Sequence, residues 1–102
     1  MGDVYAELPA AVAGRFVALT TRGDCMEPAV RDGESVVIDT EASPRVGDVI
    51  AALIQGEWTL KRLRHRDGSW LLVPDNVNYD PIEIDPNVTR VLGVAVGIWR
   101  KL

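Results

Sequence analysis

Residues 22–32, RGDCMEPAVRD, contain the only cysteine of the 102-residue chain, Cys25. Residues 15–21 (RFVALTT) precede this stretch and predict a β-strand, because they are rich in β-branched and aromatic side chains. After it, Asp32-Gly33 predicts a turn and residues 34–39 (ESVVID) predict a second strand. Cys25 is therefore expected at a turn that follows a strand, a place from which a nucleophile can point into a cleft.

The middle of the chain predicts more β structure. Residues 48–54 (DVIAALI) are apolar enough for a strand that is buried on both faces. Residues 58–64 and 69–73 flank Asp67-Gly68, a strong signal for a β-hairpin. Its two arms carry Trp58 and Trp70, so we expect these rings to pack across the hairpin.

The remaining segments predict less regular structure. Residues 74–86 hold three of the six prolines of the chain and are expected to form a surface excursion of turns and extended backbone. The closing strand, residues 89–100, is interrupted by Gly93 and Gly97, which indicates bulges or a close approach of backbones. Residues 1–13 show no clear period and are interpreted as a lead-in arm.

Composition favours one globular domain that does not bind nucleic acid directly. Hydrophobic residues make up 47% and charged residues 25% of the chain, and the formal net charge is -4. An acidic domain repels a phosphate backbone. The basic run Lys61–Arg66 has no interleaved aromatic residue, so it is interpreted as a charged strand face that runs into a turn.

Other classes of protein are disfavoured by simple counts. A single cysteine forms no internal disulfide, and residues 1–14 lack the basic start and long apolar core of a signal peptide, so we expect a cytoplasmic protein. The longest apolar run, residues 91–99, is far shorter than the roughly twenty residues of a membrane-spanning helix. With one histidine and one cysteine the chain predicts no metal site, and it has no phosphate-binding glycine loop or other sign of a cofactor.

Cys25 and Lys61 are the residues with the most chemical potential. A cysteine and a lysine can act as a nucleophile and its general base. Each also has an ordinary structural interpretation, because free cysteine is often a small buried apolar residue and lysine usually lies solvated on a strand. His65 offers a Cys-His alternative, but its place beside the Asp67-Gly68 turn predicts an exposed residue.

Six ordered blocks decide between these interpretations, because together they resemble the LexA-like (S24) peptidase family. The likeness covers essentially residues 16–100. This family comprises SOS and phage repressors and the UmuD-type mutagenesis proteins. The blocks are Gly23–Pro28, Asp32–Glu34, Gly47–Val49, Leu60–Leu63, Pro74–Ile82 and Leu92–Gly97.

The resemblance implies a fold, an activity and a site. The fold is mainly β, a compact LexA-like catalytic domain of twisted antiparallel strands with a hairpin, with residues 1–14 as the arm and 15–102 as the S24 peptidase-like domain. Family members cut their own N-terminal linker with a Ser-Lys dyad and commonly dimerise. Carried over, Lys61 is the general base, Cys25 takes the place of the nucleophile, and the backbone N–H groups of Asp24 and Cys25 form the oxyanion hole.

Cys25 is also the departure from the family, whose members carry serine at this position. A thiol ionises at a pH of about 8.5, far below a hydroxyl, so it could settle as a thiolate beside an ammonium group. Sulfur is also larger than oxygen, so a cleft shaped for oxygen loses part of its attack geometry. Activity of the chain as a peptidase therefore stays open at this point.

The sequence leaves three functions to compare. The first is a repressor domain that cleaves its own linker, with a RecA-type co-protease as a possible partner. The second is a catalytically silent module that dimerises through the apolar edge of residues 91–99. The third is a signal-peptidase-like enzyme, which the lack of a membrane anchor disfavours. Ala13-Gly14 resembles the Ala-Gly bond cut in the family, but only ten residues separate Gly14 from Cys25, too few to fold back.

Overall fold

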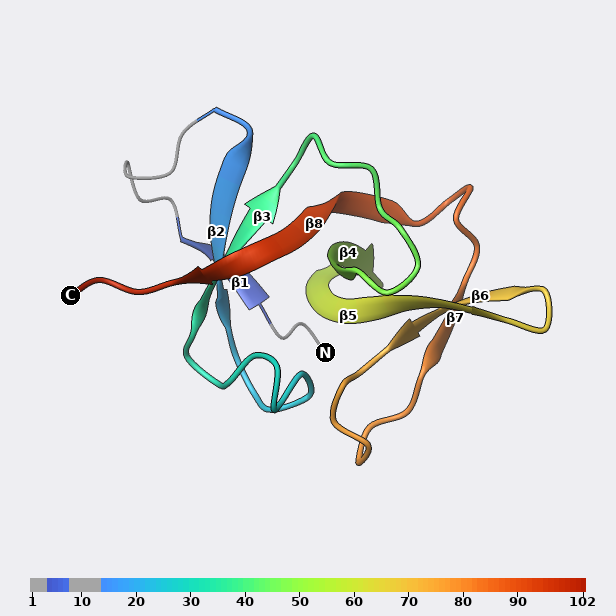
Figure 1. Cartoon of the computed structure of the whole chain (residues 1–102). Helices are drawn as coiled ribbons and strands as arrows, with labels where there is room; N and C mark the ends of the chain where they lie inside the picture. The colour runs from blue at the N-terminus through green and yellow to red at the C-terminus, as the bar shows by residue number, and fades with distance from the viewer. Residues whose placement is uncertain (1–3, 8–13) are drawn as a thin grey trace.

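The predicted strands form, and they join an antiparallel sheet that runs through the whole described chain (Figure 1). The computed structural model describes residues 4–7 and 14–102. The order of strands in the sheet is β1-β2-β3-β8-β4-β5-β6-β7. The strands are β1 (Val4–Glu7), β2 (Phe16–Thr21), β3 (Ser35–Asp39), β4 (Val49–Ile54), β5 (Glu57–Arg66), β6 (Ser69–Val73), β7 (Ile82–Ile84) and β8 (Arg90–Trp99). The expectation of a mainly β fold with a hairpin is confirmed.

Two strands lie where the sequence pattern predicted none. β1 falls within the lead-in arm, where it pairs with β2 with Val4 opposite Thr21. β7 falls within the proline-rich excursion, where it pairs with β6. Both are outer strands of the sheet, and each is held by the open edge of a longer neighbour rather than by its own residues.

The hairpin of β5 and β6 turns at Asp67-Gly68, as predicted. Both residues have positive φ angles, 51° and 81°, which is the conformation that a two-residue hairpin turn requires. The prediction that Trp58 and Trp70 pack against each other is wrong, however. Trp70 lies opposite His65, with ring centroids 4.6 Å apart, whereas Trp58 pairs with Leu53 of β4. The position opposite Trp58 lies beyond the end of β6.

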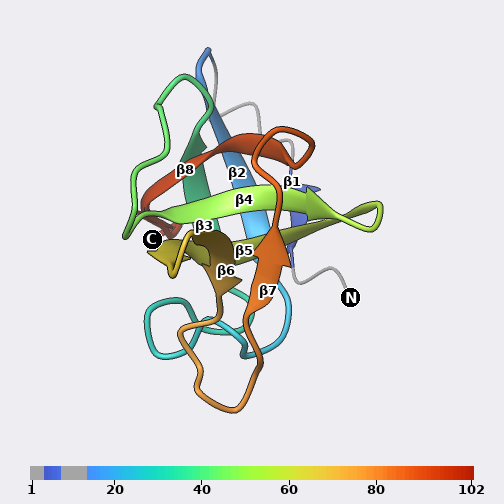
Figure 2. The ribbon, with the colours of Figure 1, turned by 90° about the vertical axis from the view of Figure 1, so that its right-hand side faces the viewer.

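The central strand β8 connects the two halves of the sheet, since it pairs with β3 on one side and with β4 on the other (Figure 2). Both pairings contain a register shift, as the two glycines predicted. A Cβ atom added to Gly93 would lie 2.3 Å from the backbone oxygen of Asp39, so only glycine fits there. No atom lies within 4 Å of a Cβ added to Gly97.

Asp39 is held firmly at this crossing of strands. Its carboxylate accepts hydrogen bonds from Nε and Nη2 of Arg15, at 3.0 and 2.5 Å, and from the backbone N–H of Glu41 at 3.0 Å. The hydrogen bond from Arg15 holds the pKa of Asp39 below its ordinary value. The backbone of Asp39 therefore has little freedom to move away from β8.

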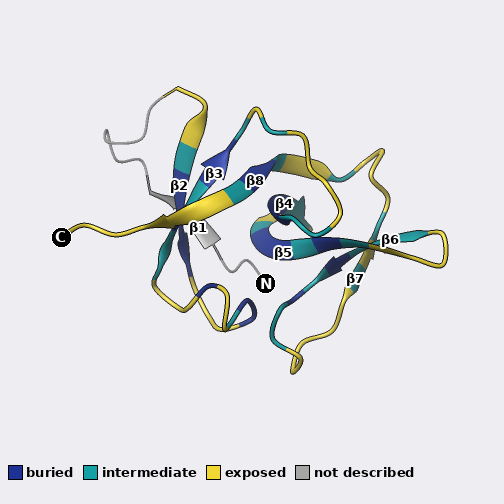
Figure 3. Cartoon of the chain, viewed as in Figure 1, coloured by how far each residue is buried: buried dark blue, intermediate teal, exposed yellow. Residues whose placement is uncertain are grey.

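Two clusters of buried apolar side chains form the core. Figure 3 shows the buried stretches of the chain in dark blue. The first packs under the turn that carries Cys25 and includes the fully buried Met26, Ile38 and Leu60. The second lies between β4, β5 and β6 and includes Ile50 and Leu72. The turn of residues 22–33, called the nucleophile turn because Cys25 is expected there in the place of the nucleophile, thus rests directly on the first cluster. This packing explains why Cys25 is held in place although it lies in a loop.

Candidate active site

Cys25 lies in a series of tight turns between β2 and β3. Glycine permits the positive φ angle of 89° at Gly23, and the N–H of Gly23 donates to Oδ1 of Asp32 at 2.7 Å. At the far end of the turns, the N–H of Gly33 donates to the Thr21 oxygen at 2.8 Å. These contacts close the loop on itself, and its cysteine is buried, with 8% of its surface exposed.

Lys61 lies on β5, and its side chain reaches Cys25. It is only 7% exposed, although lysine is rarely buried. Its Nζ lies 3.4 Å from Sγ of Cys25 and donates to the backbone oxygen of Leu60 at 3.1 Å. The same Nζ also donates to Oγ1 of Thr59. The two oxygen acceptors hold the amine against the sulfur, so a proton can pass between Nζ and Sγ without any movement of the strand.

A loop between β6 and β7, residues 74–81, lies beside the nucleophile turn in both ribbon views (Figures 1 and 2). Its start is anchored to the strand that carries Lys61, because Asp75 accepts two hydrogen bonds from Arg62, at 2.8 and 2.7 Å. The pairing raises the pKa of Arg62. Arg62 also donates through Nη1 to the backbone oxygen of Gly47 at 2.7 Å, so its side chain is fixed at both ends of its guanidinium group.

The same loop contacts the nucleophile turn directly. The backbone N–H of Asn76 donates to the oxygen of Cys25 at 3.0 Å, and its side-chain Nδ2 donates to the oxygen of Asp24 at 3.0 Å. The hydroxyl of Tyr79 donates to Oδ1 of Asp24, which raises the pKa of Tyr79. The loop therefore joins β5 to the nucleophile turn.

A cleft of about 420 Å³ lies over the Cys25 and Lys61 pair. Its wall combines the nucleophile turn, Lys61 and the loop that follows β6. The lining residues are Arg22, Gly23, Asp24, Cys25, Lys61, Pro74, Tyr79, Asp80, Pro81 and Ile82. The cleft is large enough for a short stretch of extended peptide, and its floor carries both the thiol and the amine.

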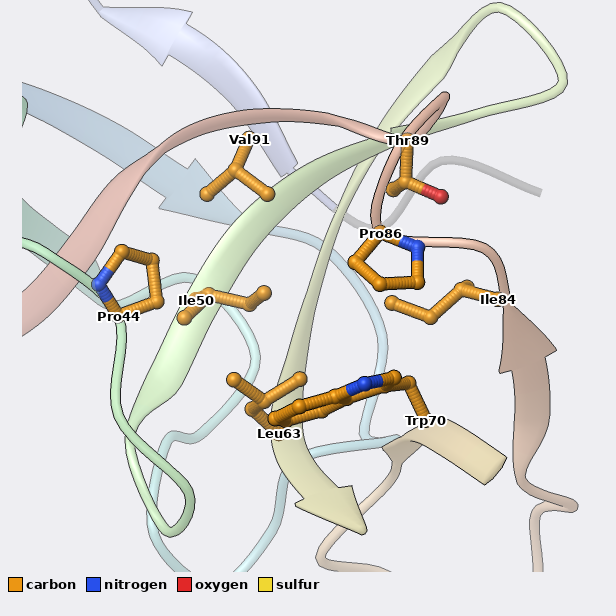
Figure 4. A pocket seen from close by; sticks show the side chains of 8 residues that line it. All are labelled: Pro44, Ile50, Leu63, Trp70, Ile84, Pro86, Thr89 and Val91. Carbon is orange, nitrogen blue, oxygen red and sulfur yellow. The ribbon is translucent and has the colours of Figure 1, made fainter. Parts of the chain in front are cut away.

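A second pocket of about 390 Å³ lies over the other core cluster (Figure 4). Its lining residues are Pro44, Ile50, Leu63, Trp70, Ile84, Pro86, Thr89 and Val91. Leu63 and Trp70 contribute the apolar floor, and Val91 lies across from them. No lining side chain is titratable, so this pocket has no group for acid-base chemistry. His65 lines neither pocket and is exposed, as predicted.

Comparison with known proteins agrees with this arrangement. A family model described as Peptidase S24-like matches residues 4–96, which is most of the chain. The chain belongs to the peptidase S24-like family. The S24-like domain is 47% identical over 90 residues to a LexA repressor of Desulfatibacillum aliphaticivorans, covering 83% of this chain and 44% of that protein.

Two further relatives of the S24-like domain carry the same name. LexA repressor 1 of Nocardia farcinica is 40% identical over 103 residues, covering 98% of this chain and 47% of that protein. A LexA repressor of Nocardioides sp. is 37% identical over 90 residues, covering 87% of this chain and 36% of that protein. The chain thus spans less than half the length of these relatives. The LexA-like resemblance drawn from the sequence blocks is confirmed.

The S24-like domain brings together the residues that the sequence singled out and adds others. Cys25 and Lys61 meet, and Asp24 lines the same cleft. Sequence reasoning missed Thr59 and took Asn76 only as a turn former. The signal for Thr59 was its place two residues before Lys61 on one strand, because such residues share a face. Asn76 lies in the Pro74–Ile82 block that carries the family resemblance, but nothing in that block indicated which residues it would contact.

The described residues contain neither a metal cluster nor a membrane-spanning helix. Among residues 4–7 and 14–102, no group of three or more His, Cys, Asp or Glu side chains could hold a metal ion. Within the same residues, no helix has the length and apolar character needed to cross a membrane.

Proposed function

We propose that this chain is the self-cleavage and dimerisation domain of a LexA/CI-type repressor or a UmuD-like protein. In this proposal Cys25 and Lys61 hydrolyse a peptide bond in the N-terminal linker of the same protein. The observation that carries the proposal is the contact of 3.4 Å between Sγ and Nζ at the floor of a cleft, in a domain of the S24-like family. The names of the relatives support a repressor as the whole protein.

Each step of the reaction has a group in the cleft. Lys61 takes the thiol proton, and Sγ of Cys25 attacks the carbonyl carbon of the scissile bond. The N–H groups of Asp24 and Cys25 stabilise the negative oxygen, a contribution of about 3 kcal/mol for one such donor. Lys61 then gives its proton to the leaving amine. Lys61 next takes a proton from a water molecule, and the resulting hydroxide attacks the thioester carbon. The thiolate of Cys25 leaves and regains its proton from Lys61, which restores the free thiol.

The exchange of serine for cysteine sets the expected rate. We expect the unmodified domain to cut an added peptide with an Ala-Gly bond slowly, and best at alkaline pH, because the thiol geometry departs from that of oxygen. Cys25→Ser should raise the rate about tenfold or more, and Cys25→Ala should remove cleavage. Mass spectrometry of the peptide products measures all three. If neither the unmodified form nor Cys25→Ser cuts the peptide, the domain is the catalytically silent dimerisation module instead.

The partners follow from the same proposal. The substrate is the linker that precedes this domain in the whole repressor, and a RecA-type filament is the proposed co-protease. The domain itself does not contact DNA, because its formal net charge of -4 repels phosphates. We place the protein in the cytoplasm, where its single thiol stays reduced.

A homodimer forms, in this proposal, through the C-terminal half of β8. Residues 90–94 of β8 pair with β4 and residues 94–99 pair with β3. Within residues 4–7 and 14–102, the second edge of residues 95–99 pairs with no strand. Val96, Ile98 and Trp99 are 55%, 46% and 40% exposed there. An open strand edge with apolar side chains suits pairing with the same edge of a second copy.

Ile98→Asp is expected to weaken this dimer at least tenfold, because it places a charge in an apolar contact. Sedimentation velocity at micromolar concentration measures the shift from dimer to monomer. Val88→Asp is the matched control, since Val88 is 75% exposed in the loop before β8 and lies outside the proposed contact. The proposed interface would be contradicted if the unmodified protein were a monomer, or if the two substitutions weakened the dimer equally.

A further inference from the structure

We propose that Asn76 is a positioning residue that orients the backbone N–H of Cys25 in the oxyanion hole. The inference rests on the proposed function, since it concerns the same cleft. Its starting point is that one residue of the loop after β6 contacts two consecutive carbonyl groups of the nucleophile turn. The oxygen of Asp24 also accepts from the backbone N–H of Glu27, at 3.1 Å, within the turn itself. The side chain of Asn76 donates to the oxygen of Asp24, and its backbone N–H donates to the oxygen of Cys25, both at 3.0 Å.

Because a peptide unit is planar, the direction of its carbonyl group also fixes the direction of its N–H group. The carbonyl of Asp24 belongs to the same planar unit as the N–H of Cys25. In a trans unit the C=O and N–H bonds point in opposite directions. Both units held by Asn76 are trans. A carbonyl of Asp24 that faces Asn76 therefore turns the N–H of Cys25 away from the loop.

Asn76 can perform this task only because the loop itself is fixed. The neighbouring Asp75 accepts two hydrogen bonds from Arg62 on β5, and the N–H of Asp75 lies 3.4 Å from Sδ of the fully buried Met26. The N–H of Asn78 donates to Oδ1 of Asn76 at 3.0 Å, which sets the rotation of the side-chain amide. The Nδ2 group is consequently aimed at Asp24 before any substrate arrives.

Asn76→Asp tests the hydrogen bond that Nδ2 of Asn76 donates to the oxygen of Asp24. The aspartate keeps the shape of the side chain and the oxygen that accepts from Asn78, but it loses the N–H donor to Asp24. We expect kcat for the Ala-Gly peptide to fall 10- to 100-fold, while KM stays within twofold, because only the developing charge on the carbonyl oxygen loses its stabilisation. Asn76→Ala, which adds no charge, should give the same change in kcat.

Alkylation of Cys25 by iodoacetamide distinguishes this role from a general loss of structure. In this reaction Sγ displaces iodide from a CH₂ carbon, and no charge develops on a carbonyl oxygen. Its rate constant should therefore change less than threefold in Asn76→Ala. Asn87→Asp is the control for charge, since it adds a carboxylate at an exposed position outside the cleft and leaves the contacts of Asn76 in place. It should cut the peptide within threefold of the unmodified rate.

The outcomes separate the two proposals. If the unmodified domain cuts the peptide and both Asn76 variants cut it within threefold of that rate, the role of Asn76 is wrong and the proposed function stands. Alkylation and cleavage that fall by the same factor in Asn76→Ala also overturn the positioning role. Absence of cleavage in both the unmodified domain and Cys25→Ser overturns the proposed function and this inference together.

Discussion

Lys61→Met is expected to lower the rate of peptide cleavage at least 100-fold, because it removes the amine that lies 3.4 Å from the sulfur of Cys25. General bases contribute about 10²- to 10⁴-fold to such reactions. Methionine keeps much of the length and apolar surface of the lysine side chain, so the buried position stays filled. Cleavage of the Ala-Gly peptide, followed by mass spectrometry, measures the loss.

The rate of alkylation by iodoacetamide provides a second measurement on Lys61→Met. Because Lys61 is proposed to take the thiol proton, alkylation of Cys25 near neutral pH should slow together with cleavage, unlike the result expected for Asn76→Ala. Lys101→Met is the matched control, since Lys101 is the other lysine of the chain and is exposed near its C-terminus. Cleavage by Lys61→Met within a few-fold of the unmodified domain would show that Lys61 is not the base.

Gly93→Ala is expected to lower the free energy of unfolding by about 3 kcal/mol, the upper end of the usual cost of overpacking. The added Cβ would lie 2.3 Å from the oxygen and 2.8 Å from the carbonyl carbon of Asp39, both backbone atoms. Arg15 and the N–H of Glu41 hold the Asp39 side chain, so the strand resists the shift that would relieve the clash. Urea denaturation followed by circular dichroism measures the change.

Gly97→Ala provides the control for Gly93→Ala on the same strand. No atom lies within 4 Å of the added Cβ, so the free energy of unfolding should change by less than about 1 kcal/mol. Equal destabilisation by both substitutions would mean that the cost arises from the loss of glycine in a strand rather than from the contact with Asp39.

Local sequence patterns correctly predicted the strands whose own residues have high strand propensity and whose ends are marked by turn residues. The Asp67-Gly68 turn, flanked by residues 58–64 and 69–73, predicted the hairpin, because a turn of this type constrains only adjacent residues. The tryptophan pair failed for a related reason. The register of a hairpin counts outward from its turn, and the count places Trp58 beyond the partner strand.

The outer strands show the limit of local patterns. β7 has three residues and β1 has four, too few for a sequence pattern that predicts a strand. They become strands because β6 and β2 offer an open edge of N–H and C=O groups. Such pairing depends on which segments lie next to each other after folding, and that information is spread over the whole chain.

The β class, the hairpin, the family resemblance and the choice of Cys25 and Lys61 as candidate site residues could all be predicted from the sequence, because motif order and strand propensity depend on consecutive positions. The folded structure was needed to show that Nζ of Lys61 lies 3.4 Å from Sγ of Cys25, and that Asn76 donates to the carbonyl groups of Asp24 and Cys25. The physical reason is that these contacts join segments 36 and about 50 positions apart. Their distances are set by packing across a shared core, which no local pattern encodes.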